Sequence, residues 1–341
     1  MITSLRVQNV RIHSSYELAL LPHTTVVTGP NGSGKTSLIE AIYVALRGTS
    51  FKGSDSDVLR RQSAWYRIDI VEDEATRTVK FDPNRTSGKK QFVIDGKTHY
   101  RLLPKYKKPV VLFEPNDLRL LHGSPSRRRE YIDTFIAQID PLYSTALRRY
   151  DRALKQRNNL LKQPAISPDE LFVWDMALSE HGAYIMKKRG EVVQQINNQL
   201  APIYQTIAGK NDAVTVHYPH ESSQQKLLAD LHAHAQRDMI LGFTSVGPHR
   251  HDISFQFADS PALAVASRGE VRSIMLALKF IEVEIMQRLL GMKPIILLDD
   301  VFSELDATRQ DHLVQNFKDY QIVITSATGS HSIEQSYTHQ L

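Results

Sequence analysis

The sequence predicts an α/β fold with a phosphate-binding loop, joined to an antiparallel β region and interrupted by an inserted helical hairpin. Three observations predict it. A glycine-rich loop, Gly29 to Thr36, lies between an apolar strand and a helix. The strongest apolar run in the chain, Ile295 to Leu298, ends in two aspartates. Between these motifs, from Ser126 to Ile207, apolar residues recur at helical spacing.

The first part of the chain favours short strands separated by turn-forming residues such as Asp95-Gly96. The exception is 35–46, where Leu38, Ile39, Ile42 and Ala45 share one face of a helix. Strands are expected at 4–10, 16–21, 24–28, 67–72, 78–81, 91–94 and 110–113.

The middle of the chain predicts an antiparallel helical hairpin that follows a helix at 126–139. Asp140-Pro141 is typical of an N-cap followed by proline at the first helical position, so a new helix begins there. A second long helix is expected from Pro168 towards Ile207, and Pro202 is expected to kink or end it. The apolar stripes of the two helices are expected to pack together; they are Tyr143, Ala146, Tyr150 and Ala153 on the first, and Leu171, Trp174, Leu178 and Ile185 on the second.

The last part of the chain returns to α/β alternation. Helices are expected at 270–290 and 307–317, and strands at 213–218, 241–246, 252–257, 295–298 and 321–325. The predicted domains are therefore a discontinuous head, 1–125 with 209–341, and a helical arm, 126–208.

Composition limits the classes of function. The 341 residues suggest about two domains, or one domain with an insert. The absence of cysteine excludes disulfides, zinc fingers and thiol catalysis. No apolar run reaches the ~18 residues that a membrane span needs, and Met1 to Val10 alternates like a strand rather than a signal peptide. We expect a cytoplasmic protein without a membrane partner.

Positive charge is concentrated in two stretches. Lys80 to Lys108 holds nine Lys or Arg against two acidic residues, and Ser126 to Gln163 holds nine against four. Such stretches are typical either of a nucleic-acid footprint or of solvated faces. The DNA-contact candidates are Arg127, Arg128, Arg129, Arg148, Arg149 and Arg152.

The glycine-rich loop matches G-x-x-x-x-G-K-[ST] at every fixed position and has the strand-then-helix context that this motif requires. Its backbone N–H groups and the helix N-terminus can hold phosphate oxygens. Lys35 can reach the terminal phosphates of ATP, and the Thr36 hydroxyl can ligate Mg²⁺. The predicted ATP contacts are Gly29, Asn31, Gly32, Ser33, Gly34, Lys35, Thr36 and Ser37.

The two aspartates supply the second half of the predicted site. In open α/β sheets, ligands gather at the carboxyl ends of the strands. Asp299 is therefore expected to hold Mg²⁺, and Asp300 to orient or deprotonate the attacking water.

Three further motifs indicate the ABC class of ATPases. Ser267-Arg268-Gly269-Glu270 has the form S-x-G-[QE] of the ABC signature, and Ser303 to Asp306 lies at the position of the D-loop. Ser326 follows the strand 321–325, where ABC ATPases carry a switch residue. In this class two protomers enclose two ATP molecules, and each signature contacts the γ-phosphate bound by the other protomer. Hydrolysis then requires an ATP-dependent homodimer, with Ser267, Gly269, Glu270 and Asp306 among its nucleotide contacts.

The whole chain resembles the RecF recombination-repair family. Several motifs that carry the resemblance are not general ABC patterns. They include GTSFKGSDSDVLR (48–60), FEPNDLRLLHGSPSRRREY (113–131), IDPLYSTALRRYDRALKQRNNLL (139–161), GPHR (247–250) and LLDDVFSELD (297–306).

The resemblance implies an ABC-type, Rad50-like ATPase head with a short helical arm. It implies slow, DNA-stimulated ATP hydrolysis and ATP-driven dimerisation on duplex DNA beside single-stranded gaps. It also implies cooperation with RecR, often together with RecO, in placing RecA on gapped DNA. Arg11 corresponds to the family's phosphate-contacting arginine, Asp300 to the catalytic carboxylate and Ser326 to the switch position.

Three positions depart from the family pattern. Ile12 follows Arg11 where the family often has Asn, and His251 stands where an acidic residue is common. Glu270 replaces the usual Gln of the signature. A carboxylate near the partner's γ-phosphate would be repulsive unless it points away or is paired with an arginine such as Arg268.

Other classes remain open alternatives. A structural DNA clamp of the SMC or Rad50 kind would separate its two ATPase halves by a far longer coiled coil. A transporter nucleotide-binding subunit would carry a switch histidine where Ser326 stands. A third alternative is a binding switch, in which ATP gates the DNA contacts and turnover is incidental.

Overall fold

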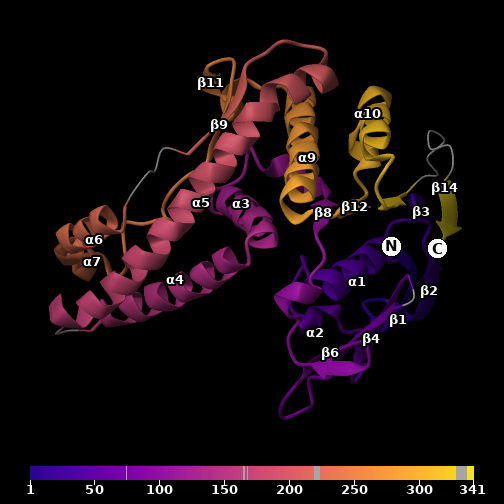
Figure 1. The fold of residues 1–341 in the computed structure, drawn as a ribbon, viewed down its shortest axis with the longest axis horizontal. Coiled ribbons are helices and arrows are strands. Elements are labelled where there is room, and N and C mark those ends of the chain that lie inside the picture. The colour runs from indigo at the N-terminus through magenta and orange to yellow at the C-terminus, as the bar shows by residue number, and fades with distance from the viewer. Residues whose placement is uncertain (74, 164–165, 167, 219–222, 328–335) are drawn as a thin grey trace. The chain divides into compact units, whose positions relative to one another are not determined.

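A computed structural model describes residues 1–73, 75–163, 166, 168–218, 223–327 and 336–341 (Figure 1). The chain separates into two compact units. The first unit combines Met1–Asp117 with Glu282–Leu341, and the second is Leu118–Ile281. The predicted arm, 126–208, falls inside the second unit, which also includes 209–281. The functional division into head and arm therefore stays a prediction.

A six-stranded antiparallel sheet occupies one side of the first unit, in the order β2-β1-β4-β5-β6-β7. Alternate side chains face the core, as expected for a half-buried sheet; Ile68 and Ile70 are fully buried, whereas the intervening Asp69 is not. The strands are β1 (Ile2–Val10), β2 (His13–Ala19), β4 (Tyr66–Glu72), β5 (Ala75–Phe81), β6 (Lys90–Ile94) and β7 (Lys97–His99).

The second sheet of this unit has five parallel strands in the order β14-β3-β13-β12-β8. Its strands are β3 (Thr24–Thr28), β8 (Val110–Phe113), β12 (Ile295–Asp299), β13 (Ile322–Ser326) and β14 (Ser336–Gln340). Because the strands are parallel, all their carboxyl ends meet at one edge, where a ligand site is expected.

Helix α1 (Lys35–Arg47) connects the two sheets. It contacts β12 and β13 of the parallel sheet and β1, β4 and β5 of the antiparallel sheet. Twelve of its 13 residues are buried, as befits a helix that is covered on every side. The smaller helices of this unit are α2 (Asp55–Val58), η1 (Pro104–Tyr106), η3 (Phe302–Glu304) and α10 (Ala307–Phe317); η2 (Pro115–Arg119) leads into the second unit.

Helices dominate the second unit. The Asp140 carboxylate caps α4 by accepting the N–H groups of Leu142 and Tyr143, which confirms the predicted helix start. Helices α4 and α5 form the predicted hairpin (Figure 1). The helices are α3 (Pro125–Ile139), α4 (Pro141–Leu160), α5 (Pro168–Ala208), α6 (Gln224–Ala233), α7 (Ala235–Leu241), α8 (Ala262–Val265) and α9 (Arg268–Leu290), which continues into the first unit. A small sheet is formed by β9 (Val214–His217), β10 (Ser254–Phe257) and β11 (Ser260–Pro261).

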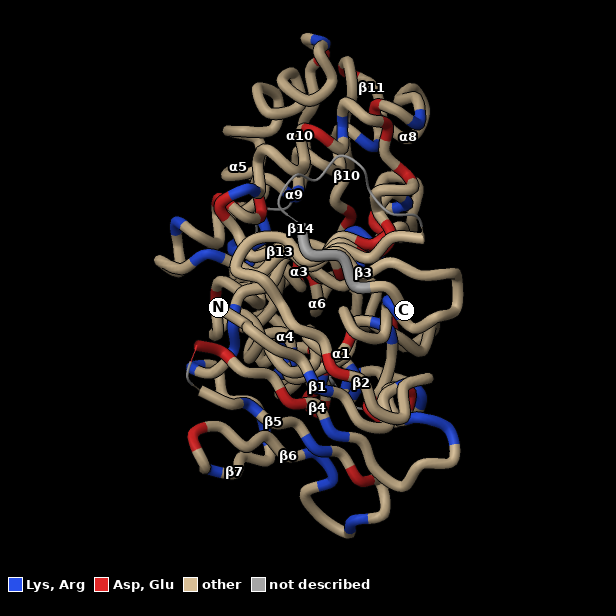
Figure 2. Tube along the Cα trace, turned by 90° about the vertical axis from the view of Figure 1, so that its right-hand side faces the viewer, with Lys and Arg blue, Asp and Glu red and all other residues tan. Residues whose placement is uncertain are grey.

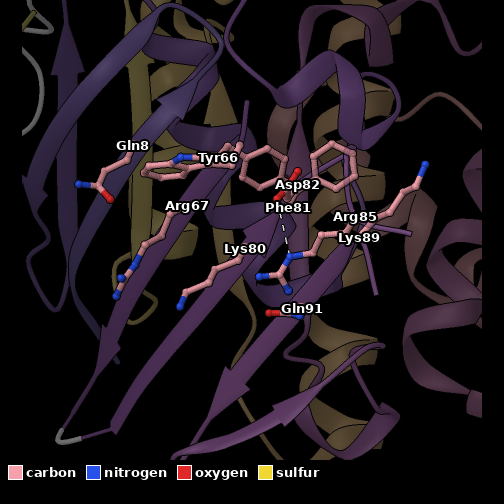
Figure 3. A pocket seen from close by; sticks show the side chains of 10 residues that line it. Gln8, Tyr66, Arg67, Lys80, Phe81, Asp82, Arg85, Lys89 and Gln91 are labelled. Carbon is pink, nitrogen blue, oxygen red and sulfur yellow. Dashed lines mark ion pairs between the residues drawn. The ribbon is translucent and has the colours of Figure 1, made fainter. Parts of the chain in front are cut away.

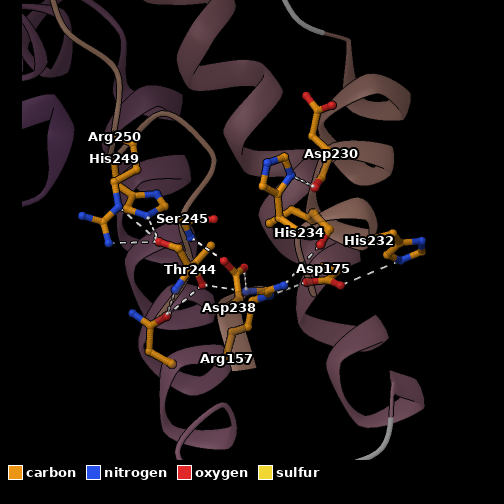
Figure 4. A network of polar contacts seen from close by, with 12 residues as sticks. Arg157, Asp175, Asp230, His232, His234, Asp238, Thr244, Ser245, His249 and Arg250 are labelled. Carbon is orange, nitrogen blue, oxygen red and sulfur yellow. Dashed lines mark hydrogen bonds and ion pairs between the residues drawn. The ribbon is translucent and has the colours of Figure 1, made fainter. Parts of the chain in front are cut away.

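A buried arginine ties α4 to the rest of the second unit (Figure 4). The fully buried Arg157 donates to Asp175 of α5 at 2.6 Å and to Asp238 of α7 at 2.6 Å. It also donates to the Thr244 hydroxyl at 3.0 Å. Arg157 lies in the second basic stretch, so part of that stretch's charge is used inside the protein.

Two sequence predictions are wrong in detail, and the structure decides one alternative that the sequence left open. Residues 241–246 are not a strand, because α7 runs to Leu241 and Gly242 ends it at φ 71°. Helix α5 reaches Ala208, in agreement with its predicted extent towards Ile207, so Pro202 does not end it. The strand 321–325 is not the last, since β14 adds to the outer side of β3. Short polar segments such as β14 pair through their backbones and leave no hydrophobic pattern to read.

No helix in the described ranges is both long enough and apolar enough to cross a membrane.

Candidate nucleotide site

The phosphate-binding loop joins β3 to α1 at the carboxyl edge of the parallel sheet. Gly34 is the N-cap of α1 and has φ 96°, a conformation that glycine adopts without steric cost. A Cβ at Gly34 would also collide with the ring of His13, whose Nε2 lies 3.1 Å from the Gly34 carbonyl oxygen. The loop therefore requires glycine here for both backbone and space.

Lys35 is folded back over this loop. Its buried ammonium group donates to the carbonyl oxygens of Gly29 at 2.6 Å and Pro30 at 2.9 Å. The nearby Ser33 hydroxyl is buried and has no hydrogen-bond partner in the described part of the chain. The Lys35 ammonium group and the Ser33 hydroxyl are therefore placed in one loop, where both can bind a phosphate group.

The predicted metal ligands meet. The Thr36 hydroxyl donates to Asp299 Oδ1 at 2.6 Å, although the two residues are 263 positions apart in the chain. The same oxygen accepts from the Thr325 hydroxyl at 2.9 Å, and Lys52 Nζ lies 3.3 Å from Asp299 Oδ2. The Asp299 carboxylate is almost fully buried and is held by two hydroxyls and an ammonium group.

These residues fit a magnesium ion. Mg²⁺ in nucleotide sites takes one or two protein oxygens and completes its shell with water and substrate phosphates. Thr36 and Asp299 supply one hydroxyl and one carboxylate side by side. The ion pair between Lys52 and Asp299 shows that this carboxylate lies next to a positive charge even without a metal ion.

Asp300 has a strained backbone beside this site. Its φ is 53°, in the left-handed region that costs most residues energy but is more often adopted by Asp. Its N–H donates to the carbonyl and the hydroxyl oxygens of Thr325 at 3.1 and 3.0 Å. One carboxylate oxygen of Asp300 is buried without a partner among the described residues. That oxygen is available to a water or a ligand.

Arg11 is held by a buried carboxylate. Its guanidinium group makes two 2.7 Å hydrogen bonds to Glu40 of α1, whose other contact is the Ser50 hydroxyl at 2.5 Å. Arg11 is only 28% exposed, and Glu40 is 1% exposed. The structure thus fixes Arg11 on α1; its predicted phosphate contact stays a prediction.

Glu114 is a third carboxylate at the carboxyl edge of the parallel sheet, directly after β8. Burial, and next the charge of Asp117, raise the pKa of Glu114 above its usual range, while Lys52 opposes the rise. Perturbed carboxylates in such places are candidates for proton transfer. Glu114 is not among the predicted site residues, because no carboxylate pattern in the sequence marks it.

The signature motif lies in the second unit and starts α9. The Ser267 N–H donates to Glu270 Oε2 at 2.8 Å, and the Glu270 N–H donates to the Ser267 hydroxyl at 3.3 Å. This reciprocal pair is a capping box. Glu270 pairs with Lys210 Nζ at 2.8 Å, so a lysine, rather than an arginine such as Arg268, compensates its charge. The hydrogen bond from Lys210, followed by the one from Ser267, lowers the pKa of Glu270 to about 2.

The other predicted nucleotide contacts take varied positions. Asn31 and Gly32 are exposed at the tip of the loop, and Ser37 is buried in the first turn of α1. In the first unit, Asp306 is the N-cap of α10 and accepts the Arg309 N–H at 3.0 Å. Ser326 is buried at the end of β13, in register with Thr28 of β3. Gly269 lies in the first turn of α9.

The predicted DNA-contact arginines divide into two groups. Arg128 is engaged by Asp252 through two 2.8 Å hydrogen bonds, and Arg129 donates to the His251 carbonyl at 2.6 Å. Both are partly buried, so their first role is structural. The other four, Arg127, Arg148, Arg149 and Arg152, are exposed.

Sequence reasoning missed four residues that position the site: Lys52, Thr325, Glu40 and Lys210. Lys52 lies within the motif GTSFKGSDSDVLR, and Thr325 directly precedes Ser326. No pattern in the sequence assigns a role to Glu40 or Lys210, because their partners, Arg11 and Glu270, are set by the tertiary structure.

The family profile described as RecF/RecN/SMC N terminal domain matches residues 1–338. A protein from Agathobacter rectalis named DNA replication and repair protein RecF is 32% identical over 95% of this chain and 91% of its own length. A protein of the same name from Chloroflexus aurantiacus is 32% identical over 94% of this chain and 92% of its own.

Solved structures agree with these matches. The structure described as the recombination mediator protein RecF-ATP in the RecFOR pathway has a TM-score of 0.88, 27% identity, and covers 99% of this chain and 95% of that one. An Smc head bound to the C-winged helix domain of ScpA has a TM-score of 0.54 and 15% identity, over 96% of this chain and 89% of that one, and shares the fold alone.

The fold, together with the contact between the phosphate-binding loop and Asp299, defines an ABC-type ATPase head of the RecF/RecN/SMC class. Within that class, the 32% identity over nearly the whole chain decides the family. The chain belongs to the RecF family.

Proposed function

We propose that this chain is an ATP-dependent DNA-binding protein of recombination and repair. It binds Mg·ATP, dimerises on ATP at gapped or single-/double-strand junction DNA, and hydrolyses ATP slowly when stimulated by DNA. The observation that carries the proposal is the 2.6 Å contact between Thr36 and Asp299, which joins the phosphate-binding loop to the carboxylate strand. The name RecF-ATP printed for a similar solved structure supports ATP as the nucleotide.

The site residues divide the chemical work. The loop N–H groups and Lys35 bind the phosphates, and Thr36 with Asp299 would hold Mg²⁺, which supplies positive charge to the terminal phosphates. Asp300 orients the attacking water through its buried carboxylate oxygen, which accepts no hydrogen bond from the described residues. Thr325 keeps both aspartates in place, because it donates to Asp299 and accepts the N–H of Asp300.

Slow turnover follows from the carboxylate at position 300. An aspartate is one methylene shorter than the glutamate of faster ABC relatives, so a water between it and the γ-phosphate is held less closely. The backbone strain at Asp300 is stored next to the reacting group, as often occurs at functional sites. We infer a switch that is reset by hydrolysis rather than a motor.

The proposed partners follow from the family. The relatives are named for DNA replication and repair, and one solved structure is named for the RecFOR pathway. We propose that this chain acts in the cytoplasm with RecR, often with RecO, and thereby helps to load RecA. The exposed Arg127, Arg148, Arg149 and Arg152 are the proposed phosphate contacts of the helical unit.

The test is the mass of the protein by light scattering on gapped DNA, with and without Mg·ATP. The expected result is a doubling of the protein mass that requires ATP and is absent in Lys35→Met. A monomer under every condition would rule out the two-ATP sandwich and leave a simple ATP-binding DNA adaptor.

A structural clamp of the SMC or Rad50 kind is the second candidate, because an Smc head shares the fold. Such a clamp would hold duplex DNA without regard to gaps. Equal ATP-dependent affinity for gapped and continuous duplex DNA would favour the clamp.

A further inference from the structure

A cavity of about 290 Å³ opens on the antiparallel sheet of the first unit, and no residue of the nucleotide loop lines it (Figure 3). Side chains from β1, β4, β5 and β6, and from the loop that joins β5 to β6, line it. Nothing in the proposed ATP chemistry uses these residues. Figure 2 shows Lys and Arg positions recurring along this part of the chain.

Four polar side chains form one row across this sheet. Gln8 of β1 is in register with Arg67 of β4, Arg67 with Lys80 of β5, and Lys80 with Gln91 of β6. Directly paired residues in antiparallel strands share one face of the sheet. The row therefore presents two amides and two cations side by side to the cavity (Figure 3).

Acidic side chains compensate only part of the positive charge that lines the cavity. Like charges directly opposite each other, such as Arg67 and Lys80, destabilise a sheet. Asp69 binds the Arg67 guanidinium group at 2.7 Å, and Asp82 lies 3.7 Å from Arg85. Across the described ranges, however, neither Lys80 nor Lys89 has an ion-pair partner, and both are exposed. An anion in the cavity would supply the missing charge.

An aromatic surface borders the same cavity. Trp65, directly before β4, is 43% exposed, which is unusual for the largest apolar side chain. The buried rings of Tyr66 and Phe81 also line the cavity and stack on each other at 5.3 Å. An exposed indole beside lysines is the combination that single-stranded nucleic acids use, with bases stacking and phosphates paired.

We propose that this cavity binds single-stranded DNA: an unpaired base stacks on Trp65, and its flanking phosphates are held by Lys80 and Lys89. The amides of Gln8 and Gln91 can donate to the base or sugar. A base within a duplex is already stacked and would have to be unstacked and unpaired, at a cost in free energy, before it could contact Trp65. The proposal rests on the proposed action at gapped DNA, and it assigns the single strand of the gap to the first unit.

Intrinsic fluorescence tests this placement. The chain has two tryptophans, Trp65 and Trp174, so Trp174→Phe leaves Trp65 as the only indole. Addition of an oligothymidylate of about ten nucleotides, close to the site size of small single-strand-binding folds, should quench Trp65 emission. The quenching should saturate and should weaken steeply as salt is raised. Absence of quenching, or equal competition by a blunt duplex, would overturn the proposal.

Variants separate stacking from charge. In anisotropy titrations with a labelled oligothymidylate, Trp65→Ala and the pair Lys80→Ala/Lys89→Ala should each lower affinity roughly tenfold or more. Trp65→Phe should retain most of the affinity. Lys97→Ala is the matched control, because Lys97 is an exposed lysine of the same sheet outside the cavity. An equal loss for Lys97→Ala would mean unspecific charge and would overturn the site.

The same titration without ATP, repeated with Lys35→Met, distinguishes this inference from the proposed function. Quenching that persists in Lys35→Met supports the cavity as a site of the single protomer. If ATP-dependent dimerisation fails while quenching survives, only the sandwich mechanism is lost. If dimerisation on gapped DNA succeeds and Trp65→Ala leaves the affinity for single strands unchanged, the cavity proposal is wrong.

Discussion

Lys210 donates a hydrogen bond to Glu270 at 2.8 Å and so forms an ion pair with the carboxylate of the signature motif. The sequence places these residues 60 positions apart, and the motif alone suggested that a carboxylate would oppose a partner's γ-phosphate. In the folded chain both Glu270 oxygens are engaged, one by Lys210 and the other by the Ser267 N–H. The carboxylate therefore caps α9 with its charge compensated.

Removing that ammonium group should weaken ATP-dependent dimerisation. In Lys210→Met, Glu270 keeps its negative charge at neutral pH but loses its partner, so it repels phosphate across the proposed dimer interface. We expect the ATP concentration needed for half-maximal dimer mass to rise roughly tenfold, the change given by about 1.4 kcal/mol.

The matched control is Lys210→Met in a Glu270→Gln background. Glutamine can still accept the Ser267 N–H but carries no charge, so the loss of Lys210 should then be nearly neutral. An equal effect in both backgrounds would show that Lys210 acts elsewhere.

Asp300→Asn should separate ATP binding from hydrolysis. Asparagine also tolerates a positive φ and keeps the backbone bonds to Thr325, so the site should keep its shape. Loss of a group that activates water lowers turnover by about 10²-fold or more. ATP affinity by calorimetry and dimer mass should stay close to those of the unaltered chain. A turnover unchanged by the substitution would assign water activation to another group, such as Glu114.

Arg157→Met should destabilise the second unit strongly. The substitution leaves Asp175 and Asp238 buried without their cation, and breaking a buried pair in this way costs about 3–5 kcal/mol. Denaturant unfolding followed by Trp174 emission in a Trp65→Phe background reports on this unit, because Trp174 lies on α5.

Arg149→Met on the same helix is the control for Arg157. Its exposed side chain predicts a change within about 0.5 kcal/mol. If the two substitutions cost the same, the network in Figure 4 does not stabilise the unit.

His249 predicts a loss of stability at mildly acidic pH. Its ring contacts the Tyr150 hydroxyl at 2.7 Å and the Thr244 carbonyl at 3.1 Å. Burial lowers the pKa of His249 from 6.5 to about 4; the Thr244 carbonyl opposes the shift, and Arg250 and Arg129 add to it. Because the unfolded chain then takes up the proton first, the stabilisation is complete above about pH 6.5 and is lost as the pH falls towards 4.

The size of this effect is on the order of 3 kcal/mol for a shift of this extent. The free energy of unfolding should be measured from about pH 7 down to about pH 4, the range set by the two pKa values. It should fall less steeply with pH in His249→Gln than in the unaltered chain. His217→Gln alters an exposed histidine and should leave the slope unchanged. The same slope in all three proteins would assign the acid sensitivity to other groups.

The sequence by itself determined the local elements. The helix at Lys35 and the strands at 24–28 and 110–113 follow from periodicity and from the residues that bound them, because such signals depend on near neighbours. The Asp140-Pro141 cap was readable for the same reason, and the confirmed capping bonds reach only two and three residues onward. The loop Gly29 to Thr36 was readable because its glycines and lysine are contiguous.

Only the tertiary structure decided the pairings between distant residues. In the folded chain Thr36 and Thr325 donate to the same oxygen of Asp299. Lys210 pairs with Glu270, and Arg128 pairs with Asp252. A side chain's charge can be read from the sequence, but its partner depends on which elements pack together. That is also why the row from Gln8 to Gln91 was invisible: strand register, set by hydrogen bonds between separate segments, aligns it.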